Sequence, residues 1–212
     1  MRVFGITGGI GVGKSYILQL FARAGFPTYN ADRRAKELME TPDLRRELSL
    51  LLGEEAYTPE GRLNRPYVAA RIFQEPALLQ KVNHLVHPLT ITDFLSWVQE
   101  QASRGHTAVF KEAALTLEAG AYAGLEALIL VYAPLKLRIQ RLKQRDGYSE
   151  AEILRRLYNQ WPEWKKIAHA DFLLINDESI PLEVQLRSFF KRYGLPLPLF
   201  LRDDACLSPP SL

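Results

Sequence analysis

The stretch Gly8-Gly9-Ile10-Gly11-Val12-Gly13-Lys14-Ser15 matches the pattern G-x-x-x-x-G-K-[ST] at every fixed position. It is preceded by the apolar, partly β-branched run 3–7, which predicts a buried parallel strand. It leads into residues 15–24, whose apolar side chains have helical spacing. A glycine-rich turn from a strand into a helix directs backbone N–H groups and the positive end of the helix dipole at phosphate oxygens. The stretch therefore predicts a P-loop that binds a nucleoside triphosphate. Lys14 would supply a cation to its β- and γ-phosphates, and Ser15 would offer a hydroxyl ligand to Mg²⁺.

The composition is that of a globular chain and excludes several classes of protein. The 212 residues are 47% hydrophobic and 24% charged, which excludes wholesale disorder. A net charge of +3, from 27 Lys and Arg against 24 Asp and Glu, does not indicate a general nucleic-acid binder. The single cysteine, Cys206, excludes a disulfide framework and a multi-cysteine zinc site. No apolar run approaches the roughly 18 residues of a membrane span. We therefore expect a cytoplasmic protein with neither nucleic-acid nor membrane partners.

Predicted strands alternate with predicted helices along most of the chain. After the first helix, the strand candidates are 27–30, 107–111, 127–132 and 172–175. Strands separated by helices predict a parallel sheet that is covered on both faces. The interval 31–104 has no convincing strand and is predicted to form consecutive helices divided at Pro-containing turns, the last of them at His87-Pro88. Ser149-Glu150-Ala151-Glu152 has the pattern of a capping box and predicts the start of a further helix.

Two acidic residues follow predicted strands and are candidates for chemistry. The carboxyl ends of parallel strands share one edge of a sheet, so Asp32, after the second strand, is expected near the P-loop. Its carboxylate could accept a proton from an attacking hydroxyl, or it could be the N-cap of the next helix. Glu112 ends the third strand, where many P-loop proteins hold an acid near Mg²⁺, but a surface carboxylate fits there equally.

Arginines are concentrated on one predicted helix. Arg138, Arg141 and Arg145 are spaced at i, i+3 and i+7 and so share a helix face. One interpretation is a lid whose arginines neutralise charge on a transferring phosphoryl group. The other is a solvated helix face without a ligand.

Taken together, these motifs resemble the dephospho-CoA kinase family over roughly residues 2–194. The run 6–15 is close to that family's P-loop. Asn30-Ala31-Asp32 resembles its D-A-D segment, with the first acid replaced and the second kept. The stretch 60–65 resembles D-G-x-L-x-R, with Glu60 in place of the first acid and Arg65 as the arginine. His87-Pro88 matches an H-P landmark. The stretch 114–118 resembles P-L-L-F-E, with Glu118 kept. Arg141 and Arg145 fit an R-x-x-x-R lid pattern, and Gln160, Ala170-Asp171 and Asn176 fit the pattern that follows it.

The resemblance implies an α/β P-loop NTPase fold of three layers, with a five-stranded parallel sheet, a helical substrate-binding insertion and a small helical lid. It implies one kinase domain over 1–202, with the core at about 1–30, 105–135 and 168–200. The insertion would cover about 31–104 and the lid about 136–167, and 203–212 are expected to be a flexible tail.

The implied reaction is ATP-dependent phosphorylation of the ribose 3′-hydroxyl of dephospho-CoA, the last step of coenzyme A synthesis, with Mg²⁺. The expected catalytic residues are Asp32 as base, Lys14 and Arg141. The expected nucleotide-binding residues are Gly8, Gly9, Gly11, Val12, Gly13, Lys14, Ser15, Tyr16 and Arg145, with Ser15 also on the metal. The expected acceptor-binding residues are Asp32, Arg65, His87 and Glu118.

The departures from the family pattern leave rival hypotheses. Asn30 keeps the shape of the first acid but not its charge, and Tyr16 stands where a Thr or similar small residue often follows the P-loop Ser. Another small-molecule P-loop kinase, acting on a nucleoside or nucleotide, is the nearest alternative. A GTP-binding switch would need an Asn-Lys-x-Asp-type element after a late strand, and the sequence contains none. A kinase-like scaffold without activity would fit Asn30 but not the retained Lys14, Ser15 and Asp32.

Overall fold

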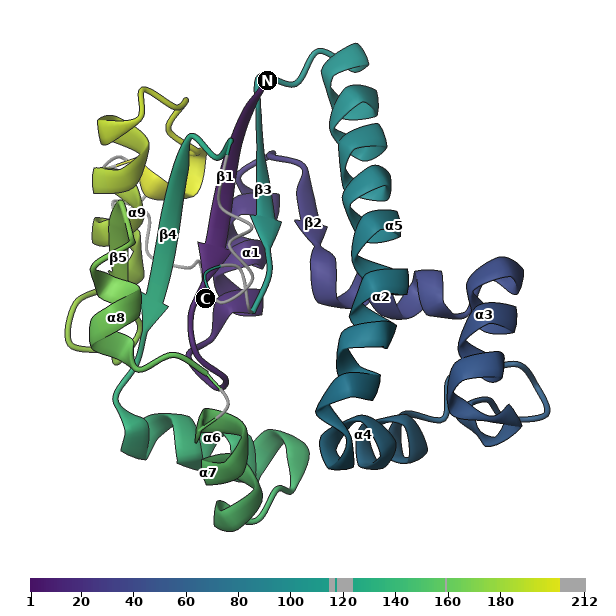
Figure 1. Ribbon diagram of the computed structural model, residues 1–212. Coiled ribbons are helices and arrows are strands. Elements are labelled where there is room, and N and C mark those ends of the chain that lie inside the picture. The colour runs from purple at the N-terminus through teal and green to yellow at the C-terminus, as the bar shows by residue number, and fades with distance from the viewer. Residues whose placement is uncertain (115–116, 118–123, 159, 203–212) are drawn as a thin grey trace, which may run out of the picture. The chain divides into compact units, whose positions relative to one another are not determined.

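The computed structural model describes residues 1–114, 117, 124–158 and 160–202, with only the backbone for 73, 74 and 76. The chain divides into two compact units, Met1–Tyr29 with Gly105–Leu212 and Asn30–Arg104. We call them the sheet unit and the helical unit; both can be followed in Figure 1. The described helices contain none that is both long and apolar enough to cross a membrane.

The sheet unit is built on five strands in the order β2-β3-β1-β4-β5. Their bounds are β1 Arg2–Thr7, β2 Thr28–Asn30, β3 Ala108–Glu112, β4 Ala127–Tyr132 and β5 Phe172–Ile175. The central strand β1 pairs in parallel with β3 and with β4, and β4 pairs in parallel with β5. All five lie within two residues of the predicted strands, and the predicted parallel sheet is confirmed.

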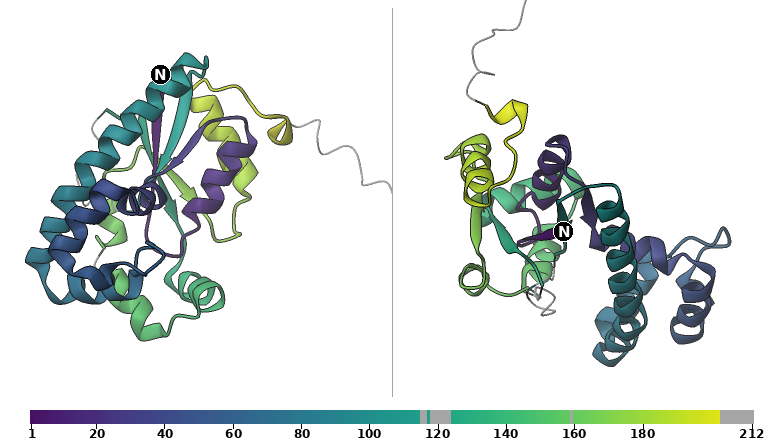
Figure 2. Two further views of the ribbon diagram at one scale, coloured as in Figure 1. Left: turned by 90° about the vertical axis from the view of Figure 1, so that its right-hand side faces the viewer. Right: turned by 90° about the horizontal axis from the view of Figure 1, so that it is seen from above.

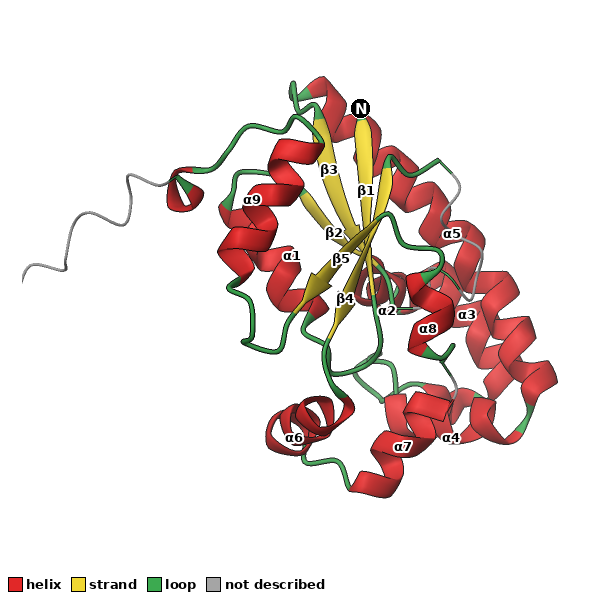
Figure 3. Ribbon diagram, turned by 90° about the vertical axis from the view of Figure 1, so that its left-hand side faces the viewer, coloured by secondary structure: helices red, strands yellow, loops and turns green. Residues whose placement is uncertain are grey.

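Helices cover both faces of this sheet. Figure 3 shows α1 (Lys14–Arg23) and α9 (Leu182–Arg192) on one face and α8 (Glu163–Ile167) on the other. The rings of Phe4 and Phe110 stack at 5.1 Å between centroids, and Phe21 from α1 stacks on Phe110 at 3.7 Å. Phe189 from α9 meets Phe4 edge-on at 5.5 Å. Since all four rings are fully buried, this aromatic core fixes α1, and with it the loop that precedes α1, against the sheet.

Between β4 and α8 lie two further helices, α6 (Leu135–Asp146) and α7 (Glu150–Tyr158). The predicted capping box is confirmed, because Ser149 N–H donates to Glu152 Oε2 at 2.9 Å and Glu152 N–H donates to Ser149 Oγ at 3.3 Å. Gly147, in the left-handed region at φ 67°, ends α6. After β5 and α9, a 3₁₀ turn spans Leu199–Leu201.

The helical unit contains α2 (Ala31–Met39), α3 (Pro42–Leu52), a 3₁₀ turn Glu54–Ala56, α4 (Arg65–Gln74) and α5 (Pro76–Ser103). Figure 2 shows α5 as the long helix of this unit. Its own apolar core includes Leu44, Leu48, Leu52, Val82 and Val86. Apart from Asn30, the last residue of β2, the described part of the unit has no strand, only one isolated antiparallel bridge, Tyr57 with Leu63. The prediction of consecutive helices is therefore confirmed.

The predicted turn at His87-Pro88 is wrong, because Pro88 lies inside α5. A proline removes one backbone N–H from a helix and usually bends or breaks it. Here the helix continues because Val82 and Val86 before the proline and Phe94 after it are buried, so packing outweighs the local preference of Pro88.

Candidate active site

The loop between β1 and α1 has the backbone that its glycines predict. Gly8, Gly11 and Gly13 have φ values of 145°, 80° and 95°. A Cβ atom at Gly8 would lie 2.4 Å from the Val131 carbonyl oxygen, and one at Gly13 would lie 2.3 Å from Asn176 Nδ2. Both the left-handed backbone and the close neighbours exclude larger residues here. The side chain of Asn176 also donates to the Val12 carbonyl at 2.8 Å, which ties the loop to the end of β5.

The two polar side chains of this loop have partners at the carboxyl edge of the sheet. Lys14 Nζ donates to the carbonyl oxygens of Gly8 and Gly9 at 3.0 and 3.1 Å and so lies across the loop. Ser15 Oγ donates to Glu112 Oε1 at 3.1 Å. Glu112, at the end of β3, is only 4% exposed. It is not a surface carboxylate, and the structure brings it to the predicted metal residue Ser15.

The pair Ser15 and Glu112 fits a magnesium ion in its donor chemistry. Mg²⁺ prefers hard oxygen ligands and in nucleotide-dependent enzymes takes one or two from the protein and the rest from phosphate and water. A hydroxyl beside a buried carboxylate offers such oxygens. The described residues contain no cluster of three or more His, Cys, Asp or Glu that would hold a metal without such help.

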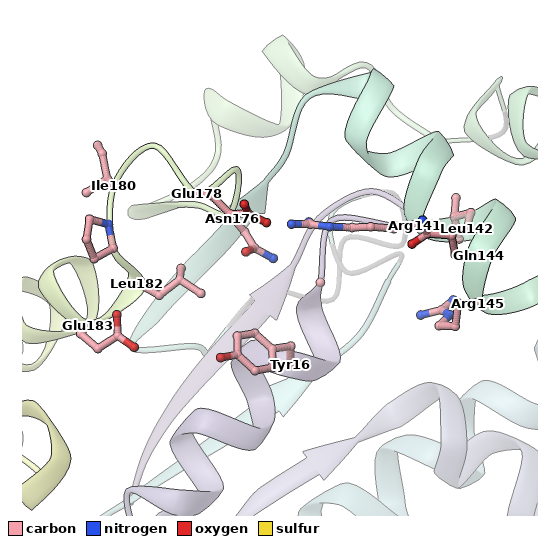
Figure 4. Close-up of a pocket in the computed structure, with 13 residues that line it drawn as sticks. Tyr16, Arg141, Leu142, Gln144, Arg145, Asn176, Glu178, Ile180, Leu182 and Glu183 are labelled. Atoms are coloured by element: carbon pink, nitrogen blue, oxygen red, sulfur yellow. The ribbon is translucent and has the colours of Figure 1, made fainter. Parts of the chain in front are cut away.

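A cavity of about 790 Å³ opens next to the loop (Figure 4). Its lining comes from the loop, the start of α1, the helix α6 and the segment between β5 and α9. The lining residues are Gly11, Gly13, Tyr16, Arg141, Leu142, Gln144, Arg145, Asn176, Glu178, Ile180, Pro181, Leu182 and Glu183. Figure 4 shows Arg141 reaching from α6 toward Asn176, with the ring of Tyr16 on the α1 side. A volume of this size is typical of small-molecule sites.

The three arginines of α6 differ in their surroundings along the helix. Arg138 is only 4% exposed and donates from Nε to the Ile10 carbonyl and from Nη1 to Glu163. Arg141 lines the cavity, and its Nη1 is buried without a hydrogen-bond partner in the described part of the chain. Arg145 lines the cavity too, but its side chain is 67% exposed and paired with Asp146, which raises the pKa of its guanidinium.

Sequence patterns did not predict the residues that shape the segment between β5 and α9. Gln185 Oε1 accepts from Ile175 N–H, and its Nε2 donates to the carbonyl oxygens of Ile175 and Ile180 at 2.8 and 2.9 Å. Glu178 has φ 70°, the only positive value among the described non-glycine residues. A glutamine within a helix gives no local signal of such contacts, whereas Asn176 was part of the family pattern.

The predicted acceptor-side residues Asp32, Arg65 and His87 belong to the helical unit, where all three are exposed. Asp32 is in the first turn of α2 and is not its N-cap, because Asn30 Oδ1 accepts from Arg33 N–H at 2.8 Å. The capping interpretation of Asp32 is therefore wrong. Arg65 begins α4 and His87 lies within α5, while Glu118 lies outside the described residues.

Comparisons with known proteins agree on one family. The model of the family described as dephospho-CoA kinase matches residues 2–181. The dephospho-CoA kinase of Bacteroides fragilis is 34% identical over 183 residues, 86% of this chain and 88% of that protein. That of Chlorobaculum tepidum is 37% identical over 181 residues, 83% of this chain and 86% of that protein.

Among solved structures, TT1252 from Thermus thermophilus is similar to this chain with a TM-score of 0.77 and 33% identity. The similarity covers 90% of this chain and 97% of that one. The dephospho-CoA kinase from Campylobacter jejuni has the same fold, with a TM-score of 0.67, 24% identity and coverage of 91% and 98%.

Proposed function

Because the chain belongs to the dephospho-CoA kinase family, we propose that it transfers the γ-phosphoryl group of ATP to the ribose 3′-hydroxyl of dephospho-CoA. The products are ADP and coenzyme A. In addition to the family, one structural observation supports the proposal. The glycine loop with Lys14 borders a cavity that is lined by Arg141 and Arg145. Another small-molecule P-loop kinase is not favoured, because the matching family model and the named relatives are dephospho-CoA kinases.

On the nucleotide side, this chain supplies positioning and positive charge. The N–H groups of the loop Gly8–Ser15 and the start of α1 would hold the phosphates, and Lys14 would move from the Gly8 and Gly9 carbonyls onto the β- and γ-phosphates. Tyr16 would contact the nucleoside part in the cavity, and Arg141 and Arg145 would lie against the phosphate chain. Charge on the transferring group would then meet fixed donors, which is the main source of rate in this reaction class.

Magnesium is the proposed metal of this site, and Ser15 with Glu112 would hold it, directly or through water. When bound, Mg²⁺ would supply positive charge that offsets the negative charge of the nucleotide phosphates. Glu112 contributes a carboxylate whose burial keeps it in place beside Ser15. Both protein ligands follow from the positions at which β3 ends and α1 begins.

On the acceptor side, Asp32 is the proposed general base. It would accept the proton of the 3′-hydroxyl while that oxygen forms its bond to the γ-phosphorus, and the bond to the bridging oxygen of ADP breaks. Its support is the retained second acid of the family pattern and a carboxylate not used for capping α2. Arg65, His87 and Glu118 are proposed to bind the acceptor, and the cytoplasmic location stays a prediction.

A coupled assay of ADP release with dephospho-CoA as acceptor tests this function. We expect ADP release from ATP and Mg²⁺ to rise far above acceptor-free hydrolysis, with coenzyme A identified by mass spectrometry. Nucleosides and nucleotides serve as competing acceptors, and Lys14→Ala controls for contaminating kinases. A preference for another acceptor, or no stimulation by dephospho-CoA, would contradict the proposal and leave only a general P-loop kinase.

A further inference from the structure

Ile10, in the middle of the loop Gly8–Ser15, has both backbone polar groups bound by side chains from distant parts of the sequence. Its N–H donates to Gln160 Oε1 at 3.0 Å, and its carbonyl oxygen accepts from Arg138 Nε at 2.8 Å. Arg138 comes from α6, and Gln160 comes from the segment between α7 and α8. The orientation of this one peptide segment is therefore set by residues that lie about 130 to 150 positions later.

Arg138 is itself held by a buried charged cluster. Its Nη1 donates to Glu163 Oε1 at 2.7 Å, and Lys166 Nζ lies 3.9 Å from the same oxygen. The side chains of Arg138 and Lys166 are 4% and 1% exposed. A planar guanidinium that donates from Nε to Ile10 and from Nη1 to Glu163 has its donors in a rigid fork, so one contact fixes the other.

Gly9 supplies independent support for this packing. Its φ does not lie in the left-handed region, so its backbone alone does not require glycine. A Cβ atom there would instead lie 2.1 Å from Arg138 Nη2 and 2.8 Å from Glu163 Oε1. Position 9 is one of the free positions of G-x-x-x-x-G-K-[ST], and its glycine is explained by the close approach of this ion pair to the loop backbone.

We propose that Arg138 and Gln160 are positioning residues for phosphoryl transfer. They fix both polar groups of Ile10 and thereby restrict the direction of the N–H groups that follow it in the loop. Arg138 also joins the loop to α6, so that the phosphate-binding backbone and the helix that carries Arg141 and Arg145 hold a common geometry. Charge stabilisation by donors depends on their alignment before reaction, which a freely rotating peptide would lose. The inference rests on the proposed role of Gly8–Ser15 as the phosphate cradle.

Gln160→Ala tests the inference by removing the acceptor for Ile10 N–H. Calorimetric titration of the full chain with ATP, inorganic triphosphate and adenosine separates phosphate binding from nucleoside binding. We expect the Kd of ATP and of triphosphate to rise about threefold to tenfold, the usual effect of one hydrogen bond, with the Kd of adenosine unchanged. Gln140→Ala, at an exposed position of α6, is the matched control and should leave all three Kd values unchanged.

Arg138→Lys is the second variant, because it keeps the buried positive charge but cannot reproduce the two directed bonds. In this variant too, the Kd of ATP and of triphosphate should rise while the Kd of adenosine stays unchanged. If Arg138→Lys fails to fold, the result for Gln160→Ala alone tests the inference. Unchanged Kd values for ATP and triphosphate in folded Gln160→Ala would overturn the inference. So would a rise in the Kd of adenosine as large as the rise in the Kd of ATP. Lys14→Ala is measured in parallel, because an unchanged Kd for ATP in that variant would instead contradict the phosphate-cradle role itself.

Discussion

The two units hold their predicted functional side chains in opposite ways. In the sheet unit, Lys14 lies on loop carbonyls and Ser15 donates to a buried Glu112, so these groups are already fixed by intramolecular bonds. In the helical unit, the side chains of Asp32 and His87 are exposed and form neither hydrogen bonds nor ion pairs with the described residues. The contrast separates the proposed phosphate side, whose groups are already bonded within the sheet unit, from the proposed acceptor side, where Asp32 and His87 have no such bonds to the described residues.

This contrast has a consequence for substitutions. A residue bound within the sheet unit contributes to both ligand binding and local structure, so its removal should change affinity and stability together. An exposed carboxylate without protein partners can be removed with little effect on folding. The strongest effects on turnover without an effect on stability are therefore expected in the helical unit.

The largest effect is expected for Asp32→Asn, which removes the proposed base but keeps the side-chain shape. Turnover should fall by roughly 10²–10⁴, because a positioned general base contributes about that factor. The Kd of ATP and the melting temperature should stay unchanged, because Asp32 neither caps α2 nor pairs with a described residue. Steady-state ADP release, titration with ATP and thermal unfolding measure these quantities.

The matched control is Asp43→Asn, since Asp43 is likewise an exposed acid in the first turn of a helix, α3. It should retain full turnover. If Asp32→Asn turned over as fast as Asp43→Asn, Asp32 would have no role as base. The exposed side chains of the helical unit would then not be distinguished by a larger effect on turnover.

Within the sheet unit, Arg141 and Arg145 should differ although both line the cavity. Arg141→Ala should lower kcat by roughly 10²–10³, the effect of losing one fixed donor to developing charge. The factor by which kcat falls in Arg145→Ala should be smaller, by about tenfold or more, because Arg145 is 67% exposed and already paired with Asp146. Pre-steady-state measurement of coenzyme A formation separates the phosphoryl-transfer step from product release. Equal losses in both variants would show that the burial of Arg141 Nη1 does not matter for the function of that residue.

A smaller effect is expected for Glu112→Gln, which keeps the volume of the buried side chain but removes its charge. The free Mg²⁺ concentration at half-maximal ADP release should rise roughly 10- to 100-fold, as for residues that orient or support metal ligands. Glu126→Gln is the control, because Glu126 forms an exposed ion pair with Arg2. An unchanged Mg²⁺ dependence in Glu112→Gln would mean that the buried carboxylate only holds Ser15.

The same contrast explains which features the sequence could predict. The P-loop was predictable because its glycines, Lys14 and Ser15 act within one short strand-turn-helix segment, where local rules decide the structure. The role of Arg138 was not, because its partner Glu163 lies 25 positions away and periodicity only places Arg138 on a helix face. Pro88 inside α5 was not predictable for a related reason, since packing on both sides of it outweighs its local preference.

Asn30 and Asp32, at the start of α2, show a limit of a different kind. Asn30 and Asp32 are both good N-cap residues, two positions apart, and sequence alone could not decide which of them caps the helix. The structure assigns the cap to Asn30, which also ends β2. The residue that departs from the family pattern thus has a structural function, which an Asp at the same position could equally perform.

The smallest expected effect is on stability, in variants of Asn30. Asn30→Ala removes the acceptor of Arg33 N–H and should lower the free energy of unfolding by about 1 kcal/mol, the usual cost of losing an N-cap. Asn30→Asp should restore that stability, because a carboxylate caps a helix N-terminus as well as an amide does. Urea unfolding measures both variants, and ADP release should change much less in Asn30→Ala than in Asp32→Asn. A turnover in Asn30→Asp well above that of the natural chain would instead show that the charge of the family's first acid contributes to catalysis, and that its replacement here has a cost that capping alone does not explain.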